Sequence, residues 1–299
     1  MKIGILASNP KDWHIQSLIT ELERVRVEHT CFPITSFATR ISGFPRVVGG
    51  GYDLAEFDAV LVRAIPGGSL EQIIFRMDTL HRLENLGIRV INSASAIEKC
   101  VDKYYTSTLL EDAGILTPKT IATESFRSAM QAFDELGGDV VVKPLFGSFG
   151  VGMVRVDDRD VAHRVFKALQ MARNVFYIQE FVLHENQDIR AFVIGDRVVA
   201  SMLRVGGDWK TNIARGAKAK HYRLSPELEE LCVKASKVVG CEYAGVDILQ
   251  SEKDGRFYVT EVNSAPGWEG LQTVTEANIA QSLVEYVIRA CSNWSRTHP

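Results

Sequence analysis

Oxygen-bearing side chains interrupt two apolar segments near the end of the chain, at residues 245–249 and 257–263. The apolar runs and the polar turn between them predict a pair of neighbouring β-strands. Side chains two positions apart share one face of a strand, which places Glu261 beside Asn263. The opposite face is expected to carry Thr260, Val262 and Ser264. Asp247, on the paired strand, can join Glu261 and Asn263. The pattern predicts either a Mg²⁺ site completed by substrate phosphates or an acidic edge strand with solvated charges.

A lysine ends the apolar run at 140–144, and a glycine-rich turn follows it. Lys143 is poorly placed for a core, and glycines let backbone N–H groups approach an anion closely. The turn contains Gly147, Ser148, Gly150 and Gly152. Because the lysine precedes the glycines, this is not the P-loop pattern. Run and turn together predict a loop that covers phosphates, whereas the turn alone is more typical of a tight hairpin.

The segment 178–182 is expected to be an extended connection between two lobes. It contains Gln179, Glu180 and Phe181. Backbone groups of such a connection can bind the edge of an adenine, with apolar side chains on both faces of the ring. Taken alone, the segment is more typical of an ordinary strand. Downstream, Asp188 and Arg190 share a strand face, so they either pair with each other or bind a ribose and a phosphate.

A polar, strongly basic stretch at 206–221 follows Arg204. Arginine forks suit carboxylate and acyl-phosphate oxygens. The candidates within the stretch are Lys210, Thr211, Asn212 and Arg215. The alternative is a solvated loop, which is the better interpretation for Lys218 and Lys220 taken individually.

The composition of the chain is typical of a globular protein and limits the classes of function to consider. The 299 residues are enough for two or three lobes, and 46% hydrophobic with 24% charged residues is an ordinary globular balance. A net charge of -3 gives no general reason to expect nucleic-acid binding, and no apolar run reaches the length of a membrane span. The five cysteines form no CxxC pair, which favours reduced thiols and a cytoplasmic location. The sequence leaves open a homo-oligomer.

Apolar periodicity and turn signals predict strands that alternate with helices in the first third of the chain, followed by a second unit. In the first part, strands are expected at 2–7, 28–33, 59–62 and 87–92, with helices at 12–25 and 70–86. Further helices are expected at 101–113, 125–136, 160–172, 224–239 and 275–291, and a hairpin at 189–204. The alternation in the first part indicates a small parallel α/β lobe.

In their order along the chain, these features resemble the ATP-grasp superfamily and, within it, the RimK-type α-L-glutamate ligases. The matching positions are Asp102, Lys103, Lys143, Gln179, Glu180, Asp188, Ile189, Arg190, Asn212, Asp247, Glu261 and Asn263. The resemblance covers nearly the whole chain and implies an α/β (α+β lobes) ATP-grasp fold. It implies an N-terminal parallel α/β domain at 1–96 and an ATP-grasp domain at 97–299. The second domain would hold a small central lid lobe at about 120–182 and a C-terminal mixed-sheet lobe.

The resemblance also implies an activity: ATP-dependent ligation of L-glutamate to an acceptor carboxylate through an acyl phosphate. ATP and two Mg²⁺ ions would be the cofactors, and Mn²⁺ could substitute. The segments 65–68 and 72–76 look closest to the archaeal and methylotroph branch that adds glutamate to tetrahydromethanopterin. Alternative acceptors are a deazaflavin cofactor, a ribosomal protein tail or an amino-group carrier protein. The alternative from another class is a nucleotide-binding regulatory module without turnover.

The roles that the resemblance implies fall into three groups. Nucleotide contacts would come from Lys103, Lys143, the glycine turn, Gln179, Glu180, Phe181, Asp188, Lys210, Thr211 and Asn212. Asp247, Glu261 and Asn263 would hold the metal ions, with Glu261 bridging them. Arg190, Arg204 and Arg215 are the candidates for the acyl phosphate and the substrate carboxylates. The chain departs from the family at Ala214 and Ala217, where histidine and glycine are frequent, and at Lys210, where arginine is common.

Overall fold

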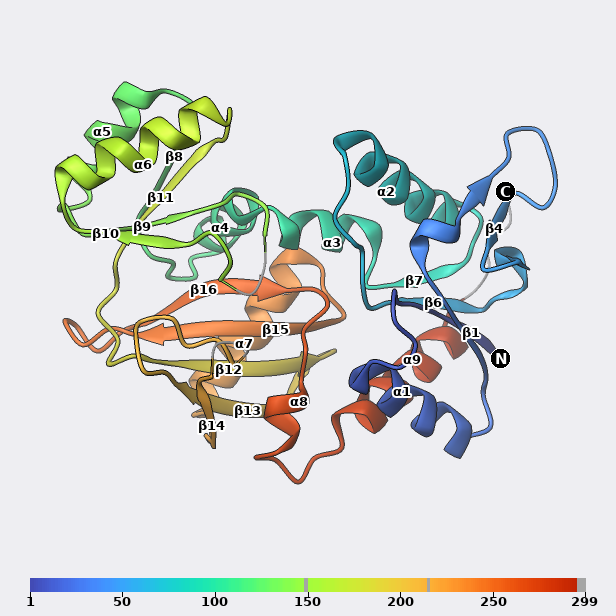
Figure 1. Ribbon diagram of the computed structural model, residues 1–299. Coiled ribbons are helices and arrows are strands. Elements are labelled where there is room, and N and C mark those ends of the chain that lie inside the picture. Colours follow the sequence, from blue (N-terminus) through green and yellow to red (C-terminus); the bar gives the residue numbers. More distant parts are fainter. Residues whose placement is uncertain (148–149, 214–215, 295–299) are drawn as a thin grey trace.

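The computed structural model describes residues 1–147, 150–213 and 216–294, and it has three lobes (Figure 1). The N-terminal and C-terminal lobes lie side by side. The central lobe stands over the C-terminal sheet, beyond the strand β16. The central and C-terminal lobes are each built on one sheet, and residues of both sheets line the cleft between these lobes.

The N-terminal lobe is a parallel sheet in the order β2-β1-β6-β7. Its strands are β1 (Lys2–Leu6), β2 (Glu28–Phe32), β6 (Ala59–Val62) and β7 (Arg89–Ile91), and its helices are α1 (Trp13–Arg24) and α2 (Leu70–Asn85). The alternation of strands and helices predicted for this part is confirmed. Asp12 caps α1, and Ser69 with Gln72 forms a capping box at the start of α2.

A small antiparallel sheet, absent from the sequence-based prediction, completes this lobe. It consists of β3 (Ala38–Thr39), β4 (Val47–Gly49) and β5 (Tyr52–Asp53), flanked by the 3₁₀ turns η1 (Ile34–Ser36) and η2 (Leu54–Glu56). Strands of two or three residues are too short to produce a periodic pattern, so they cannot be predicted from apolar alternation.

The central lobe is an antiparallel sheet in the order β10-β9-β11-β8. Its strands are β8 (Thr120–Thr123), β9 (Val140–Lys143), β10 (Val154–Val156) and β11 (Phe176–Glu180). Helices α5 (Phe126–Glu135) and α6 (Arg159–Met171) cover one face, and together they enclose a separate core that includes Phe133, Phe166 and Phe176. The other face is left for the cleft.

The C-terminal lobe carries a sheet in the order β14-β13-β12-β15-β16, and each described pairing in it is antiparallel. Its strands are β12 (Gln187–Ile194), β13 (Arg197–Val205), β14 (Lys218–His221), β15 (Tyr243–Gln250) and β16 (Phe257–Asn263). The predicted hairpin is confirmed, with Gly195 and Asp196 between β12 and β13. Its helices are α3 (Ala94–Val101), α4 (Lys103–Asp112), α7 (Pro226–Val239), α8 (Glu269–Gln272) and α9 (Ile279–Ser292).

Two predicted helices differ from those observed. The helix expected at 101–113 is α4, which begins only at Lys103, because Asp102 has an extended backbone (ψ 102°) and its carboxylate caps α4 by accepting from the Tyr105 N–H. The helix α3, which ends at Val101 just before this cap, is absent from the sequence-based prediction. This break sets Lys103 at the first position of α4. The closing helix begins at Ile279 rather than 275, because Asn278 caps it. None of the described helices is long and apolar enough to cross a membrane.

The N-terminal and C-terminal lobes share one hydrophobic core and a buried polar anchor. The core runs from Ile3 and Leu18 to Phe192 and Leu283. At the anchor, the fully buried Asn92 amide donates to the carbonyls of Tyr243 (2.8 Å) and Ser264 (2.6 Å). Its oxygen accepts from the Glu242 and Tyr243 N–H groups. The start of β15 and the segment after β16 are therefore fixed by a residue of the N-terminal lobe.

Candidate functional site

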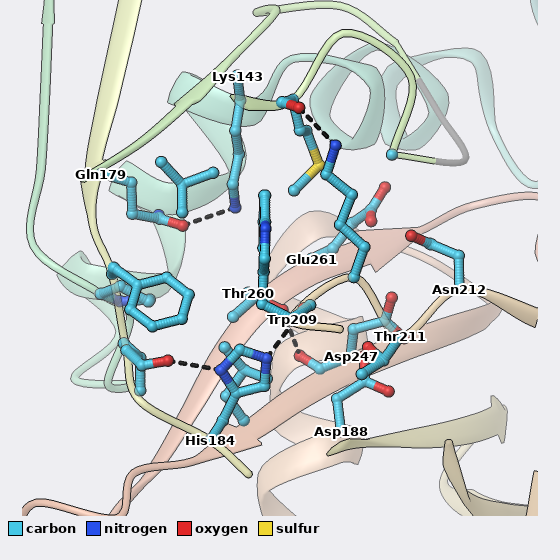
Figure 2. Close-up of a pocket in the computed structure, with 18 of the residues that line it drawn as sticks. Lys143, Gln179, His184, Asp188, Trp209, Thr211, Asn212, Asp247, Thr260 and Glu261 are labelled. Carbon is cyan, nitrogen blue, oxygen red and sulfur yellow. Dashed lines mark hydrogen bonds between the residues drawn. The ribbon is translucent and has the colours of Figure 1, made fainter. Parts of the chain in front are cut away.

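A pocket lies between the central and C-terminal sheets, and we call it the inter-lobe pocket (Figure 2). The central lobe contributes the end of β9, the strand β11 and the connection that follows it. The C-terminal lobe contributes β15, β16 and the loop before β14. The residues that line it are Lys103, Pro118, Val141, Lys143, Gly150, Met153, Gln179, Glu180, Phe181, Val182, His184, Asp188, Arg204, Trp209, Lys210, Thr211, Asn212, Asp247, Leu249, Thr260 and Glu261.

Two lysines bring positive charge to one end of this pocket. Lys143 ends β9, and its Nζ donates to Gln179 Oε1 at 2.6 Å (Figure 2). Lys103 begins α4, and its Nζ donates to the Gly147 carbonyl at 2.7 Å. Burial lowers the pKa of both amines, that of Lys143 to about 8. Burial of two neighbouring ammonium groups is unfavourable because both lose their hydration. A polyanionic ligand that binds both groups would offset this cost, so the pair favours such a ligand.

The acidic strand pair contains a β-bulge that sequence alternation does not predict. Asp247 pairs with Glu261, but the next residue, Ile248, pairs with Val259. The extra residue is Thr260, so Thr260 and Glu261 both line the pocket, and the expected alternation at this point is wrong. Thr260 Oγ1 donates to the Asp247 carbonyl at 3.3 Å. The bulge aims the Glu261 carboxylate at the end of the pocket near the lysines.

Behind this strand pair lies a buried network of two carboxylates and two guanidinium groups. The registers place Asp188 opposite Arg204 and Arg190 opposite Asp247. Arg204 binds both carboxylates, with Nε 2.7 Å from Asp188 Oδ1 and Nη2 3.0 Å from Asp247 Oδ2. Arg190 Nη2 lies 3.0 Å from the same Asp247 oxygen. Asp188 and Arg190 thus pair with neighbouring strands rather than with each other.

The charge on Asp247 follows from these contacts. Burial alone would raise the pKa of Asp247, but Arg190 and Arg204 together hold it below its usual range. Gly245 makes the Arg190 contact possible, since a Cβ there would lie 2.3 Å from Arg190 Nη1. The network therefore keeps a carboxylate ionised on the floor of the pocket.

The connection after β11 has limited capacity to bind a ligand through its backbone. The N–H of Glu180 donates to the Lys119 carbonyl and that of Phe181 to the Asp139 carbonyl. The Val182 N–H donates no hydrogen bond to any of the described residues. His184 contacts the Val182 carbonyl (2.6 Å) and the Trp209 carbonyl (3.0 Å), joining the connection to the loop before β14.

The glycine turn meets that same loop. Gly150 has φ +67°, and a Cβ there would lie 2.7 Å from Asn212 Oδ1. Lys210 Nζ donates to the Met153 carbonyl at 2.7 Å, so a second residue of the loop binds the segment after the turn. Because both contacts cross from one lobe to the other, the turn and the loop close one side of the pocket together.

A second pocket, which we call the adjoining pocket, lies between the N-terminal lobe and the end of β16. Residues 62–65 form one wall and α3 another. The residues that line it are Val62, Arg63, Ala64, Ile65, Ile97, Cys100, Val101, Gly147, Glu261, Asn263, Ser264 and Ala265. Glu261 lines both pockets, so this residue lies where the two meet.

The donor set at this junction fits a magnesium ion. Burial and the neighbouring Asp247 raise the pKa of Glu261, so a cation there would favour its ionised form. Asp247 Oδ1 is buried and forms an ion pair with Arg190 Nε. No group of three His, Cys, Asp or Glu side chains is placed to hold a metal in the described ranges. Two carboxylates with the Asn263 amide match an ion that takes its remaining ligands from phosphates and water.

Most of the predicted site residues meet in these two pockets. The inter-lobe pocket brings together Lys103, Lys143, Gly150, Gln179, Glu180, Phe181, Asp188, Arg204, Lys210, Thr211, Asn212, Asp247 and Glu261. Gly147 and Asn263 line the adjoining pocket. Arg190 and Gly152 line neither, and Ser148 and Arg215 fall outside the described residues. The roles assigned to all these residues stay predictions.

Sequence reasoning missed several residues of the pocket walls. Leu249 lies two positions after Asp247 on the same strand, so period-two spacing could have identified it. Trp209 lies in the Gly-Asp-Trp-Lys motif but was given no role, and in Figure 2 its side chain stands in the middle of the pocket. Neither His184 nor Met153 stands in a motif that would have identified it.

Comparison with known proteins places this geometry in a family. Residues 1–97 match the RimK PreATP-grasp domain and residues 100–287 the RimK-like ATP-grasp domain. The tetrahydromethanopterin:alpha-L-glutamate ligase of Methanocaldococcus jannaschii is 37% identical over 299 residues, which cover 97% of this chain and 99% of that protein. A probable alpha-L-glutamate ligase of Syntrophotalea carbinolica is 33% identical over 292 residues, covering 96% and 95%.

Solved structures agree on the fold. The ATP-grasp ligase PsnB, complexed with a minimal precursor, Mg and ADP, superimposes with a TM-score of 0.75 at 22% identity, covering 97% of each chain. The predicted ATP-grasp fold is confirmed. Because the family match and relatives above 30% identity span nearly the whole sequence, the chain belongs to the RimK-like ATP-grasp family of ATP-dependent ligases.

Proposed function

We propose that this chain uses ATP to join the amine of L-glutamate to the carboxylate of an acceptor. The observation that carries the proposal is the position of Glu261 in the walls of both pockets. One pocket has cations suited to the phosphates of a nucleotide, and the other is open to a second reactant. A γ-phosphate at the junction would face an acceptor carboxylate entering from the adjoining pocket.

The nucleotide would lie along the inter-lobe pocket. Val141, Met153 and Leu249 offer apolar surface to an adenine ring, and the Val182 N–H is available to its edge. Lys103 and Lys143 would then bind phosphate oxygens at the other end. The proposed nucleotide contacts also include Asp188 at the ribose, and Gly147, Gly150, Gly152 and Asn212 around the phosphates.

The reaction requires that the acceptor carboxylate be activated, since a carboxylate does not react with an amine in water. Its oxygen attacks the γ-phosphorus, the bond to the β-phosphate oxygen breaks, and ADP leaves. The glutamate amine then attacks the acyl carbon, phosphate leaves, and the amine proton passes to solvent or phosphate. The task of the protein is to position the reactants and to stabilise the developing charge.

Two Mg²⁺ ions, held by Asp247, Glu261 and Asn263, would supply neutralisation of phosphate charge, and we propose that Mn²⁺ can replace them. Lys143 is held by Gln179 in a position to add positive charge at the same end of the pocket. Arg204 and Arg190 keep Asp247 ionised and oriented. We keep both, with Arg215, as candidates for contacts to the acyl phosphate and the substrate carboxylates.

For the acceptor we propose tetrahydromethanopterin or a related cofactor. Three relatives named tetrahydromethanopterin:alpha-L-glutamate ligase, 32% to 37% identical to the chain, support this choice. Relatives named only as probable alpha-L-glutamate ligases keep the other acceptors open. The division into domains at 1–96 and 97–299, with a lid at 120–182, also stays our proposal. So do a cytoplasmic location and a homo-oligomer.

The test is to incubate the protein with ATP, Mg²⁺ and L-glutamate and with each candidate acceptor in turn. Mass spectrometry follows the acceptor, and a coupled assay follows ADP. The proposal predicts ADP release that depends on the acceptor, together with an acceptor heavier by one or more glutamyl residues. ATP binding without ADP release for any acceptor would instead identify a nucleotide-binding regulatory module.

A further inference from the structure

Two cysteines far apart in the sequence bring their sulfur atoms together beside the adjoining pocket. Cys100 Sγ lies 3.4 Å from Cys241 Sγ, although 141 positions separate them. Cys100 is in the last turn of α3, and Cys241 lies between the end of α7 and the start of β15. Both are free thiols. The ligase reaction proposed above has no use for either of them.

Hydrogen bonds and packing fix the backbone around Cys241, so the fold itself determines the position of its sulfur atom. Gly240 ends α7 with φ +81°, a conformation that suits glycine. The Cys241 N–H then donates to the Ser236 carbonyl at 2.9 Å, and its carbonyl accepts from Ser236 Oγ at 3.2 Å. A Cβ on Gly240 would lie 3.9 Å from the Cβ of Ala96, one turn before Cys100, so α3 packs directly on this corner.

The two thiols differ in access. Cys100 lines the adjoining pocket and is partly exposed, whereas Cys241 is 6% exposed. A small reagent that enters the pocket therefore meets Cys100 first. The hydrogen bond with Cys100, together with burial, raises the pKa of the Cys241 thiol, so Cys241 keeps its proton while Cys100 reacts.

We propose that Cys100 and Cys241 form an oxidisable thiol pair that a peroxide converts to a disulfide, and that this disulfide impairs substrate binding in the adjoining pocket. The Cys100 thiolate attacks a peroxide oxygen, an S–O bond forms, the O–O bond breaks, and the alcohol or water leaves after protonation. Cys241 Sγ then attacks Cys100 Sγ, the S–O bond breaks, and the departing hydroxide takes the Cys241 proton to leave as water. The two thiols supply the two electrons that reduce the peroxide.

The geometry needs only a small movement. The sulfur atoms must approach from 3.4 Å to about 2.05 Å, and side-chain rotation with a slight shift of the last turn of α3 can provide this. That turn forms a wall of the adjoining pocket and leads through Asp102 to Lys103. A shift there misplaces the acceptor relative to the nucleotide. This consequence rests on the proposed function, whereas formation of the disulfide does not.

The experiment treats the full chain with hydrogen peroxide and maps cysteine-containing peptides by mass spectrometry before and after dithiothreitol. The expected product is a peptide pair joined between Cys100 and Cys241 and separated by dithiothreitol. The ligation rate should fall about tenfold to hundredfold on oxidation and recover on reduction. Cys241→Ser should give no linked pair. Cys31→Ser is the matched control and should form the pair as the wild type does.

Oxidation at Cys31 or Cys291 with no link between Cys100 and Cys241 would overturn the proposal. A linked pair with an unchanged ligation rate, measured against the reduced form of the same protein, would overturn its consequence for the pocket. Failure of the reduced protein to ligate glutamate to any acceptor would refute the proposed function. The peptide map would still decide whether the thiol pair forms a disulfide.

Discussion

Replacement of Lys143 by methionine should weaken ATP binding and, at the same time, make the protein more stable. The side chain keeps its length and its apolar stem but loses its charge. If Lys143 binds a phosphate in this partly buried site, loss of the contact costs about 2–5 kcal/mol, by analogy with interfacial charge pairs. The dissociation constant for ATP should then rise about 30- to 4,000-fold.

The gain in stability follows from the cost of burying the ammonium group. A fall in the pKa of Lys143 from 10.5 to about 8 corresponds to about 3 kcal/mol of lost stability at neutral pH. Loss of the hydrogen bond to Gln179 returns about 1–2 kcal/mol of this, leaving Lys143→Met about 1–2 kcal/mol more stable. Because the pKa is lower in the folded state, the penalty is complete below pH 8. It disappears as the pH rises from 8 to 10.5.

Calorimetry of ATP binding and urea unfolding at pH 7 and pH 10 would measure both effects. In the wild type, ATP affinity should also fall above pH 8, as the free protein loses the ammonium proton. Lys253→Met, at an exposed position in the turn between β15 and β16, is the matched control and should change neither quantity. Wild-type ATP affinity in Lys143→Met would refute the phosphate contact. Lower stability than the wild type at pH 7 would refute the argument from burial.

Three further predictions follow from other contacts. Gly150→Val should reduce turnover by orders of magnitude without unfolding the protein, because a Cβ at φ +67° would meet Asn212 Oδ1; full activity would mean that the turn is a plain hairpin. His14→Gln should cost about 1 kcal/mol at pH 8, because His14 Nε2 accepts from the Trp268 N–H. Burial lowers the pKa of His14, so the wild type loses this advantage as the pH falls below 6.5; urea unfolding at pH 8 and pH 5 should show the difference shrinking, and a constant difference would contradict the assignment. Asn92→Ala should destabilise the protein by about 3 kcal/mol or more, since it leaves buried backbone groups unpaired; thermal unfolding within 1 kcal/mol of the wild type would be inconsistent with the anchor.

The parts of the site that the sequence could predict are those carried by short-range patterns. The three valines at 140–142 predict β9 and put Lys143 at its end, and the glycine turn follows. The cap at Asp102 is also predictable, since aspartate before a helical stretch is a strong N-terminal signal. Family resemblance added the order of motifs, which extended these local signals to the whole chain.

What the sequence could not predict depends on register between strands. No residue type in 257–263 predicts a bulge, so simple alternation puts Thr260 on the face opposite Glu261. In the same way, the sequence leaves open whether Asp188 and Arg190 pair with each other, and only the registers give each one a different neighbour. Contacts between residues about 150 positions apart, such as those of Asn92 with Glu242 and Tyr243, likewise cannot be predicted from local sequence patterns.

The position of Glu261 at the junction of the two pockets is the central claim, and Glu261→Gln tests it most directly. The change keeps the size of the side chain and removes its charge. Turnover should be measured across a Mg²⁺ titration beside Asn263→Ala, with Glu252→Gln, in the exposed turn after β15, as control. The account predicts a fold as stable as the wild type and a fall in turnover of about 10²–10³-fold or more, larger than for Asn263→Ala and not restored by excess Mg²⁺. Near-normal turnover of Glu261→Gln at ordinary Mg²⁺ would mean that β16 is a solvated acidic edge, and the claim would be contradicted.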